Sequence, residues 1–361
     1  MAALGLTGVP TRYDCDRDAL GELLAGEPRY RVDQVWDGLH RRLAAPSELT
    51  VLPKALRARL EEELPPALTP VAESRDRRGT TVKWLYALPD GARVETVLMH
   101  CRDRSTVCVS SQAGCAMGCG FCATGQAGFE RHLTTGEIVE QVVRAARRAR
   151  DDGRRLGNVV LMGMGEPLAN FDRVWTAVER IHHDLGLSAR RITVSTVGLV
   201  PGIRRLAAAD LPVNLAVSLH AANDALRDEL VPINRRHPLS VLMSACADHL
   251  RAKGRRLSFE WALIDGTNDR ASDARELAEL ARGLPLPAHV NLIPLNPTPG
   301  FGTRGSSPAR VERFREWLRE LGVNATVRRN RGVDIDAACG QLAARVPAPG
   351  RRPVEVSARA R

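Results

Sequence analysis

The sequence predicts an α/β protein with a mostly parallel sheet, preceded by a small helical domain. From about residue 105 a strand pattern followed by a helix pattern repeats six times, and the strand patterns are mostly apolar rather than alternating. Such strands are typical of parallel sheets whose two faces are both covered. A doubly wound sheet and a complete or partial barrel both satisfy this rhythm.

Length and composition agree with a folded protein. The chain has 361 residues, enough for two or three domains or for one barrel with an appended domain. Apolar residues make up 44% and charged residues 26%, which excludes a disordered or fibrous chain. No apolar run approaches the roughly 18 residues of a membrane span, and the first residues lack a secretion-signal pattern. We expect a cytoplasmic monomer without membrane association.

The first 80 residues predict a small helical accessory domain. Apolar residues recur at helical spacing in three segments separated by Gly, Pro and Ser, namely 19–24, 30–43 and 53–64. Residues 81–100 predict a β-hairpin with its turn at Pro89, Asp90 and Gly91. We expect this hairpin to be a linker to the main domain.

Residues 101–346 predict the main domain. Its strand patterns cover residues 106–111, 158–162, 192–195, 213–219, 257–264 and 289–294. The helix after the first strand begins with Thr134 and Glu137 at the spacing of a capping box, and a later helix begins with Ser307 and Pro308. Residues 347–361 are rich in Pro, Gly and Arg and predict a loose basic tail.

The charge balance indicates a polyanionic partner. Lys plus Arg is 52 and Asp plus Glu is 42, which gives a net charge of +10. Nearly all of the basic residues are arginine, which forms bidentate contacts with phosphate, and arginine doublets recur along the chain. The alternative is that each doublet lies on a solvated helix face of mixed charge. The number of doublets favours a nucleic acid.

Three of the eight cysteines have metal-ligand spacing. Cys115, Cys119 and Cys122 lie in a Gly-rich loop directly after the first strand of the main domain. Three thiolates on such a loop can ligate three irons of a cubic iron-sulfur cluster and leave the fourth iron open to a substrate. The alternative is zinc, although zinc sites commonly use paired two-residue gaps and a second pair of ligands.

This spacing, with the aromatic Phe121 directly before the third cysteine, resembles the signature of the radical S-adenosylmethionine (SAM) family. The resemblance implies a partial (β/α)6 barrel whose 4Fe-4S cluster binds SAM and cleaves it to a 5′-deoxyadenosyl radical. Working residues of such barrels lie at the carboxyl ends of strands. The resemblance therefore implies that SAM is bound by Gly165, Glu166, Ser195, Ser218, Leu219, His220 and Asn296. Taken singly, such Gly, Ser and Asn residues are more often turn or capping residues.

A narrower resemblance covers most of the chain, from about residue 30 to residue 346. Five segments are similar to the RlmN and Cfr family of RNA adenine methyltransferases, namely 108–112, 125–129, 218–221, 291–297 and 334–342. The resemblance implies methylation of carbon 2 of an adenine in 23S rRNA, with RNA contacts from the helical N-terminal domain and an electron donor such as flavodoxin or ferredoxin. It leaves open whether tRNA is a second substrate. The alternatives are methylation of carbon 8, a radical SAM reaction on a small molecule or protein, and a zinc-stabilised RNA-binding module.

The same resemblance implies three catalytic residues. Cys339 takes a methyl group from one SAM, and the radical from a second SAM converts that methyl into a carbon radical that adds to adenine. Glu95 accepts the adenine proton, and Cys108 attacks the sulfur of Cys339, which releases the RNA and leaves a disulfide bond. The alternatives are a buried small residue for Cys339, strand packing for Cys108 and a solvated hairpin charge for Glu95.

Overall fold

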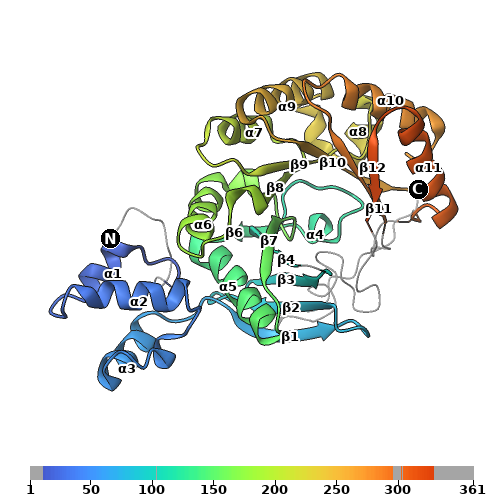
Figure 1. Ribbon diagram of the computed structural model, residues 1–361. Helices are drawn as coiled ribbons and strands as arrows, with labels where there is room; N and C mark the ends of the chain where they lie inside the picture. The colour runs from blue at the N-terminus through green and yellow to red at the C-terminus, as the bar shows by residue number, and fades with distance from the viewer. Residues whose placement is uncertain (1–10, 103, 296–301, 303, 329–361) are drawn as a thin grey trace.

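A computed structural model describes residues 11–102, 104–295, 302 and 304–328 of the chain (Figure 1). Three helices near the N-terminus lie beside a curved sheet that is covered by helices on its outer side. Asn296, Cys339 and the predicted basic tail lie outside the described residues. Within the described part of the chain, no helix is both long enough and apolar enough to cross a membrane.

The N-terminal domain contains the three predicted helices, α1 (Arg17–Leu23), α2 (Tyr30–His40) and α3 (Lys54–Glu63), and one short 3-10 helix, η1 (Pro46–Glu48). Helix α1 begins at a capping residue, since the Asp16 carboxylate accepts the Ala19 N–H at 2.8 Å. The helices bury apolar side chains that recur at helical spacing, including Leu20, Val35, Leu39, Leu56 and Leu60.

One ten-stranded sheet extends from this domain through the whole main domain, in the order β1-β2-β3-β4-β7-β8-β9-β10-β11-β12. Strands β1 (Thr69–Arg75), β2 (Thr81–Ala87), β3 (Arg93–His100) and β4 (Ser105–Cys108) pair antiparallel with one another in that order. The predicted hairpin is therefore present, but it belongs to the main sheet rather than bridging to it. Strand β1 lies in the segment expected to be helical, and most of its side chains are exposed, so its sequence carries little strand signal.

The following strands run parallel to β4 and to one another, namely β7 (Leu156–Leu161), β8 (Ile192–Thr196), β9 (Asn214–Ser218), β10 (Leu257–Leu263), β11 (His289–Pro294) and β12 (Asn324–Val327). The six predicted strand positions are confirmed, and β12 is an additional strand that the sequence did not predict. Neighbouring strands follow chain order without a reversal. A doubly wound sheet reverses its order at a switch point, so the described strands form an open, partial barrel.

Helices alternate with these strands, namely α5 (Thr135–Asp151), α6 (Phe171–His183), α7 (Val200–Ala208), α8 (Asp224–Leu230), α9 (Leu239–Lys253), α10 (Ala271–Arg282) and α11 (Pro308–Glu320). Short 3-10 helices occur at η2 (Pro167–Asn170), η3 (Ala189–Arg191) and η4 (Pro232–Arg235). A separate two-stranded sheet contains β5 (Gln112–Gly114) and β6 (Phe129–His132), with α4 (Ala123–Gln126) between them. The predicted capping box is confirmed, since the Thr134 hydroxyl accepts the Glu137 N–H and the Glu137 carboxylate accepts the Thr134 N–H.

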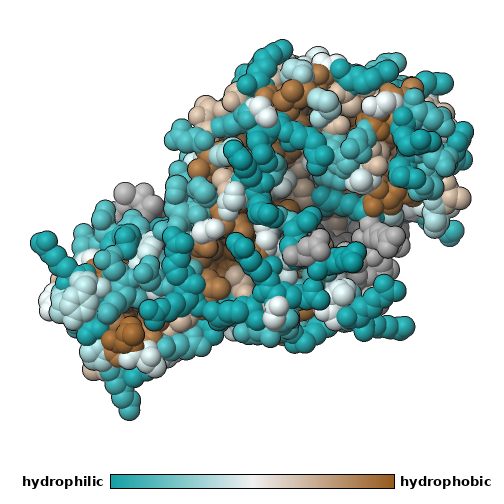
Figure 2. Space-filling model, viewed as in Figure 1, coloured by the Kyte–Doolittle hydropathy of each residue, from teal (hydrophilic) through white to brown (hydrophobic). Residues whose placement is uncertain are grey.

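The two faces of the parallel strands differ in polarity. One face carries large apolar side chains that are buried against the helices, including Val159, Leu161, Val194, Leu215 and Phe259. Alternate residues of a strand point to the opposite face, and there the side chains are small or polar, including Asn158, Thr193, Ser195, Ser218, Glu260 and Asn291. Figure 2 shows a largely hydrophilic outer surface. The apolar side chains thus fill the layer between sheet and helices, and the inner face is left for polar chemistry.

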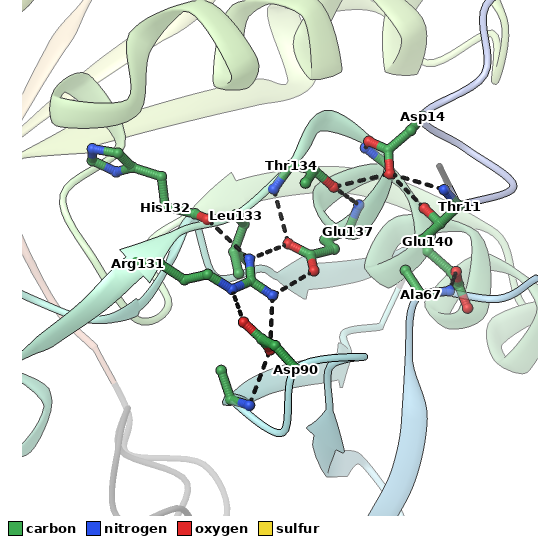
Figure 3. Close-up of polar contacts among 12 residues, drawn as sticks. Thr11, Asp14, Ala67, Asp90, Arg131, His132, Leu133, Thr134, Glu137 and Glu140 are labelled. Atoms are coloured by element: carbon green, nitrogen blue, oxygen red, sulfur yellow. Dashed lines mark hydrogen bonds and ion pairs between the residues drawn. The ribbon is translucent and has the colours of Figure 1, made fainter. Parts of the chain in front are cut away.

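Polar contacts at the start of α5 join three parts of the chain (Figure 3). Arg131 of β6 forms ion pairs with Asp90 in the β2–β3 turn and, at 2.7 Å, with the buried carboxylate of Glu137. Asp14 of the N-terminal domain accepts the Gly136 N–H at 2.7 Å. These contacts fix the N-terminal domain and the β2–β3 hairpin against the sheet that precedes α5.

Candidate active site

The clustered cysteines lie on the loop between β5 and β6. The neck of this loop is narrow, because a Cβ on Gly114 would lie 2.0 Å from the Gly128 carbonyl oxygen, and Gly114 has φ +73°. Cys119 is buried among apolar residues that follow the ends of β9 and β10, namely Ala221, Leu230, Val231 and Ile264. The ring of Phe121 contacts the ring of His220 edge to face, with centroids 4.7 Å apart. The loop therefore folds over the carboxyl ends of the parallel strands.

The thiols of this loop affect one another electrostatically. Burial raises the pKa of Cys115 to about 11. It also raises the pKa of Cys119, with the neighbouring Cys122 and Cys115 adding to the effect. Within the described ranges, no three His, Cys, Asp or Glu side chains already surround a metal position. The donor set nevertheless fits a 4Fe-4S cluster, because three coupled, partly buried thiols on one loop match three irons whose charge stabilises thiolates.

Gly165 and Glu166 lie in the turn after β7. Gly165 has φ +99°, and a Cβ there would lie 2.5 Å from the Gln112 Cβ, so the turn requires glycine. The buried Glu166 carboxylate accepts the N–H of Leu168 at 2.9 Å and the N–H of Val197 at 2.8 Å. Burial raises the pKa of Glu166 to about 7, and the two backbone hydrogen bonds oppose that effect. Glu166 therefore joins the end of β7 to the end of β8.

Ser195, Ser218, Leu219 and His220 lie at the ends of β8 and β9, which are neighbours in the sheet. Leu219 turns its side chain into the core, and its backbone N–H donates to the Glu260 carbonyl oxygen at 3.0 Å. His220 has φ +61°, which is uncommon for a residue other than glycine. Its Nδ1 accepts the Ala262 N–H at 3.0 Å, and burial lowers the pKa of His220 to about 3, so the ring is neutral. Such strained backbone is typical of functional sites.

Arg227 is a site residue that the sequence analysis missed. Its side chain is fully buried, and it donates to the carbonyl oxygens of Val197 at 2.6 Å and Leu219 at 3.1 Å. It therefore ties the ends of β8 and β9 together. Its charge also lowers the pKa of Cys119, against the larger effect of burial. In an arginine-rich chain, no local pattern distinguishes this arginine from the others.

Glu95 and Cys108, expected to be the proton acceptor and the resolving thiol, lie on the adjacent strands β3 and β4. Cys108 pairs with Val97, and Glu95 is two residues from Val97, so the two side chains point to the same face of the sheet. Glu95 is 3% exposed, so its alternative interpretation as a solvated hairpin charge is wrong. Its carboxylate forms an ion pair with the buried Lys83 ammonium at 2.9 Å. The sequence analysis did not single out Lys83.

A second polar group lies on the inner face of the sheet. Asn291 donates to Glu260 Oε1 at 2.7 Å, and Arg328 Nη2 lies 3.2 Å from Glu260 Oε2. Arg328 follows β12 and also donates to the sulfur of Met162, which follows β7, at 3.5 Å. The Arg328 side chain therefore reaches across the open end of the barrel. These contacts depend on strand register, which no local motif reveals.

The predicted site residues within the described ranges all lie at one end of the sheet, around the cysteine loop. This fold and this loop define a radical SAM enzyme, and residues 109–281 match the model of the radical SAM superfamily. A solved radical SAM methyltransferase from Sphaerobacter thermophilus is similar with a TM-score of 0.88 and 53% identity, over 92% of this chain and 98% of that chain.

Two curated relatives narrow the class to one family. The probable dual-specificity RNA methyltransferase RlmN of Roseiflexus castenholzii is 49% identical, over 95% of this chain and 99% of that protein. The dual-specificity RNA methyltransferase RlmN 1 of Myxococcus xanthus is 51% identical, over 96% of this chain and 98% of that protein. The chain belongs to the RlmN family of radical SAM RNA methyltransferases. The predicted enzyme class is confirmed, and the family implies a 4Fe-4S cluster and SAM as cofactors.

Proposed function

We propose that this protein methylates carbon 2 of an adenine in 23S rRNA and in tRNA. The observation that carries the proposal is the placement of Glu95 and Cys108 on one face of adjacent strands, at the end of the sheet that the cysteine loop covers. A general radical SAM enzyme needs neither a base nor a second thiol beside its cluster loop. Both residues are required when a covalent link between RNA and protein has to be formed and then broken.

The described residues include candidates to hold each cofactor. Cys115, Cys119 and Cys122 would hold the 4Fe-4S cluster, and SAM would lie against the Gly165-Glu166 turn and the ends of β8 and β9. Bound together, the two cofactors supply the radical that removes a hydrogen atom from the methyl group of Cys339. An electron donor such as flavodoxin or ferredoxin in the cytoplasm would support this chemistry.

The protein residues then complete the transfer. Once the carbon radical on Cys339 has added to carbon 2 of the adenine, Glu95 accepts the proton from that carbon, and the unpaired electron of the adduct passes to a one-electron acceptor. The Cys108 thiolate attacks the Cys339 sulfur, so a sulfur-sulfur bond forms and the bond between that sulfur and the transferred carbon breaks. Its electron pair stays on the carbon, which takes up a proton and becomes the methyl group. A reductant must afterwards restore both thiols.

Nucleoside analysis tests the proposed position. Purified protein with a reconstituted cluster is incubated with SAM, reductant and unmodified 23S rRNA or tRNA, and the digested RNA is compared by mass spectrometry with 2-methyladenosine and 8-methyladenosine standards. We expect 2-methyladenosine from both RNAs. The 8-methyl isomer, or methylation of neither RNA, would contradict the proposal. The names of the relatives favour carbon 2, because they are RlmN proteins.

A further inference from the structure

The ion pair between Lys83 and Glu95 lies in an unusual setting. Lys83 is 0% exposed and is among the largest fully buried side chains of the described residues. Its Nζ lies 2.9 Å from Glu95 Oε2, and the Glu95 side chain is 2% exposed. Taking two charges out of water costs several kcal/mol per ion, and apolar replacements of such pairs are often neutral or stabilising. Stability alone therefore does not account for a lysine at this position.

The sheet register places this lysine beside the proposed chemistry. Lys83 of β2 pairs with Val97 of β3, and Val97 pairs in turn with Cys108 of β4. Directly paired residues share a face of the sheet, so the Lys83 side chain lies on the face that carries Glu95 and Cys108. Arg93, two residues before Glu95, shares this face as well. The backbone of Glu95 is also fixed, since its carbonyl oxygen accepts the Ser110 hydroxyl at 2.6 Å.

The opposite face of the same strand has a structural role. Trp84 and Tyr86 alternate with Lys83 along β2 and pack towards α5. There the Arg144 guanidinium lies 5.3 Å from the centre of the Tyr86 ring and forms an ion pair with the buried Glu140 carboxylate at 2.7 Å. Helix α5 therefore places a partly exposed cation pair, Arg144 with Glu140, against the packing face of β2, whereas the Lys83–Glu95 pair lies on the face of the proposed active site. Arg144 thus provides a matched control on the other face of the strand.

We infer that Lys83 is a positioning residue that orients Glu95 and compensates its charge, so that Glu95 can accept the proton from carbon 2 of adenine. This inference rests on the proposed function. A buried carboxylate without a cation beside it takes up a proton from solution, and a protonated carboxyl group cannot act as the acceptor. In the step itself the C–H bond at carbon 2 breaks, the proton forms an O–H bond at Glu95, and the electron pair stays in the adenine ring. The ammonium group of Lys83 keeps its own proton.

Four variants test the inference in single-turnover methylation of RNA. Lys83→Gln keeps a hydrogen-bond donor for Glu95 but removes the charge, and we expect methylation to slow by about 100-fold, a typical contribution of positioned proton transfer. Lys83→Arg keeps the charge and should recover most of that loss. Glu95→Gln should be at least as slow as Lys83→Gln. The double variant should be no slower than Glu95→Gln alone, because Lys83 acts through Glu95.

An isotope measurement separates positioning from a merely structural effect. With RNA that carries deuterium at carbon 2 of the target adenine, Lys83→Gln should show a larger isotope effect than the wild type, because proton removal becomes slower than the other steps. The cluster spectrum and the methyl group on Cys339 should stay at wild-type levels in this variant. Arg144→Gln, the matched control, should leave the isotope effect unchanged.

The results that would contradict the role of Lys83 differ from those that would contradict the proposed function. Wild-type rates in Lys83→Gln, additive losses in the double variant, an unchanged isotope effect or loss of the Cys339 methyl group would each overturn the role of Lys83. If instead the wild type carries no methyl group on Cys339 and Glu95→Gln methylates RNA normally, the proposed function itself fails.

Discussion

Glu166→Gln should change how the stability of the protein depends on pH. Burial raises the pKa of Glu166 from 4.5 to about 7 in the folded state. Between these values the folded protein binds a proton that the unfolded chain does not. The contribution of Glu166 to the free energy of unfolding is therefore largest below about pH 4.5, and it is lost as the pH rises through 7. The difference of about 2.5 pKa units corresponds to roughly 3 kcal/mol at 1.36 kcal/mol per unit.

Glutamine at this position cannot titrate, so it should remove that pH dependence. Both carboxylate oxygens accept backbone N–H groups, from Leu168 and from Val197, so one of them would face the amide NH2 of glutamine. That mismatch costs about 1–3 kcal/mol at every pH and cancels when two pH values are compared.

Urea unfolding of the cluster-free protein at pH 5 and pH 8 measures the effect. Between these pH values the wild type should lose about 2.5 kcal/mol more of its unfolding free energy than Glu166→Gln does, because part of the change already occurs below pH 5. Parallel losses in the two proteins, within about 0.5 kcal/mol, would show that Glu166 is ionised in the folded state across this range and would refute the reasoning.

Three further predictions concern the chemistry and the RNA. Replacing Cys115, Cys119 or Cys122 by Ala should abolish the iron-sulfur absorption and SAM cleavage. The control Cys246→Ala, in the core, should keep both. A single variant of the loop that keeps a full cluster and activity would contradict the cluster assignment. Cys108→Ala should keep its cluster and accumulate a covalent protein-RNA species on denaturing gels, stable to thiol reductants; normal turnover would refute the resolving role. For each tenfold rise in salt concentration, the logarithm of the RNA affinity should fall by roughly 0.7 to 0.9 per neutralised phosphate. An affinity that does not change with salt would show that the arginine excess does not serve RNA binding.

The arginine doublets show what the number of charged residues can and cannot predict about RNA contacts. Arg147 lies 2.7 Å from the Glu48 carboxylate and Arg148 lies 2.9 Å from that of Asp152, so this doublet is engaged within the protein. Exposed pairs of this kind contribute little to stability and exchange readily with solvent. The sequence shows how many arginines are present, but the fold decides which of them already have a carboxylate partner.

The parts of the fold that could be predicted are those whose signal is local. Strands β4, β7, β8, β9, β10 and β11 are short, mostly apolar segments, and each was found near its observed place. Strands β1 and β12 lie at the two edges of the sheet, and neither strand contains a buried residue. Edge strands bury only a few side chains, so their sequences lack the apolar run that identifies a central strand.

The candidate site likewise contains residues that a local motif reveals and residues that it does not. The three cysteines and the Gly165-Glu166 turn are contiguous motifs, and the sequence revealed them. Lys83 and Arg227 were missed because their partners are fixed by the strand register and by the ends of strands far apart in the chain. Lys83 carries a weak signal, since it is one of three lysines in the chain and lies within an apolar strand segment.

The sheet order separates two kinds of chemistry. The turn after β7 and the ends of β8 and β9 belong to the parallel part of the sheet, where any radical SAM enzyme needs its cofactor contacts. Glu95 and Lys83 lie instead on the antiparallel strands β2 and β3, which extend that sheet beyond β4. Cys108 stands at the last residue of β4, where the two parts meet. An antiparallel extension can therefore carry the proposed base beside the proposed resolving thiol without disturbing the proposed cofactor site.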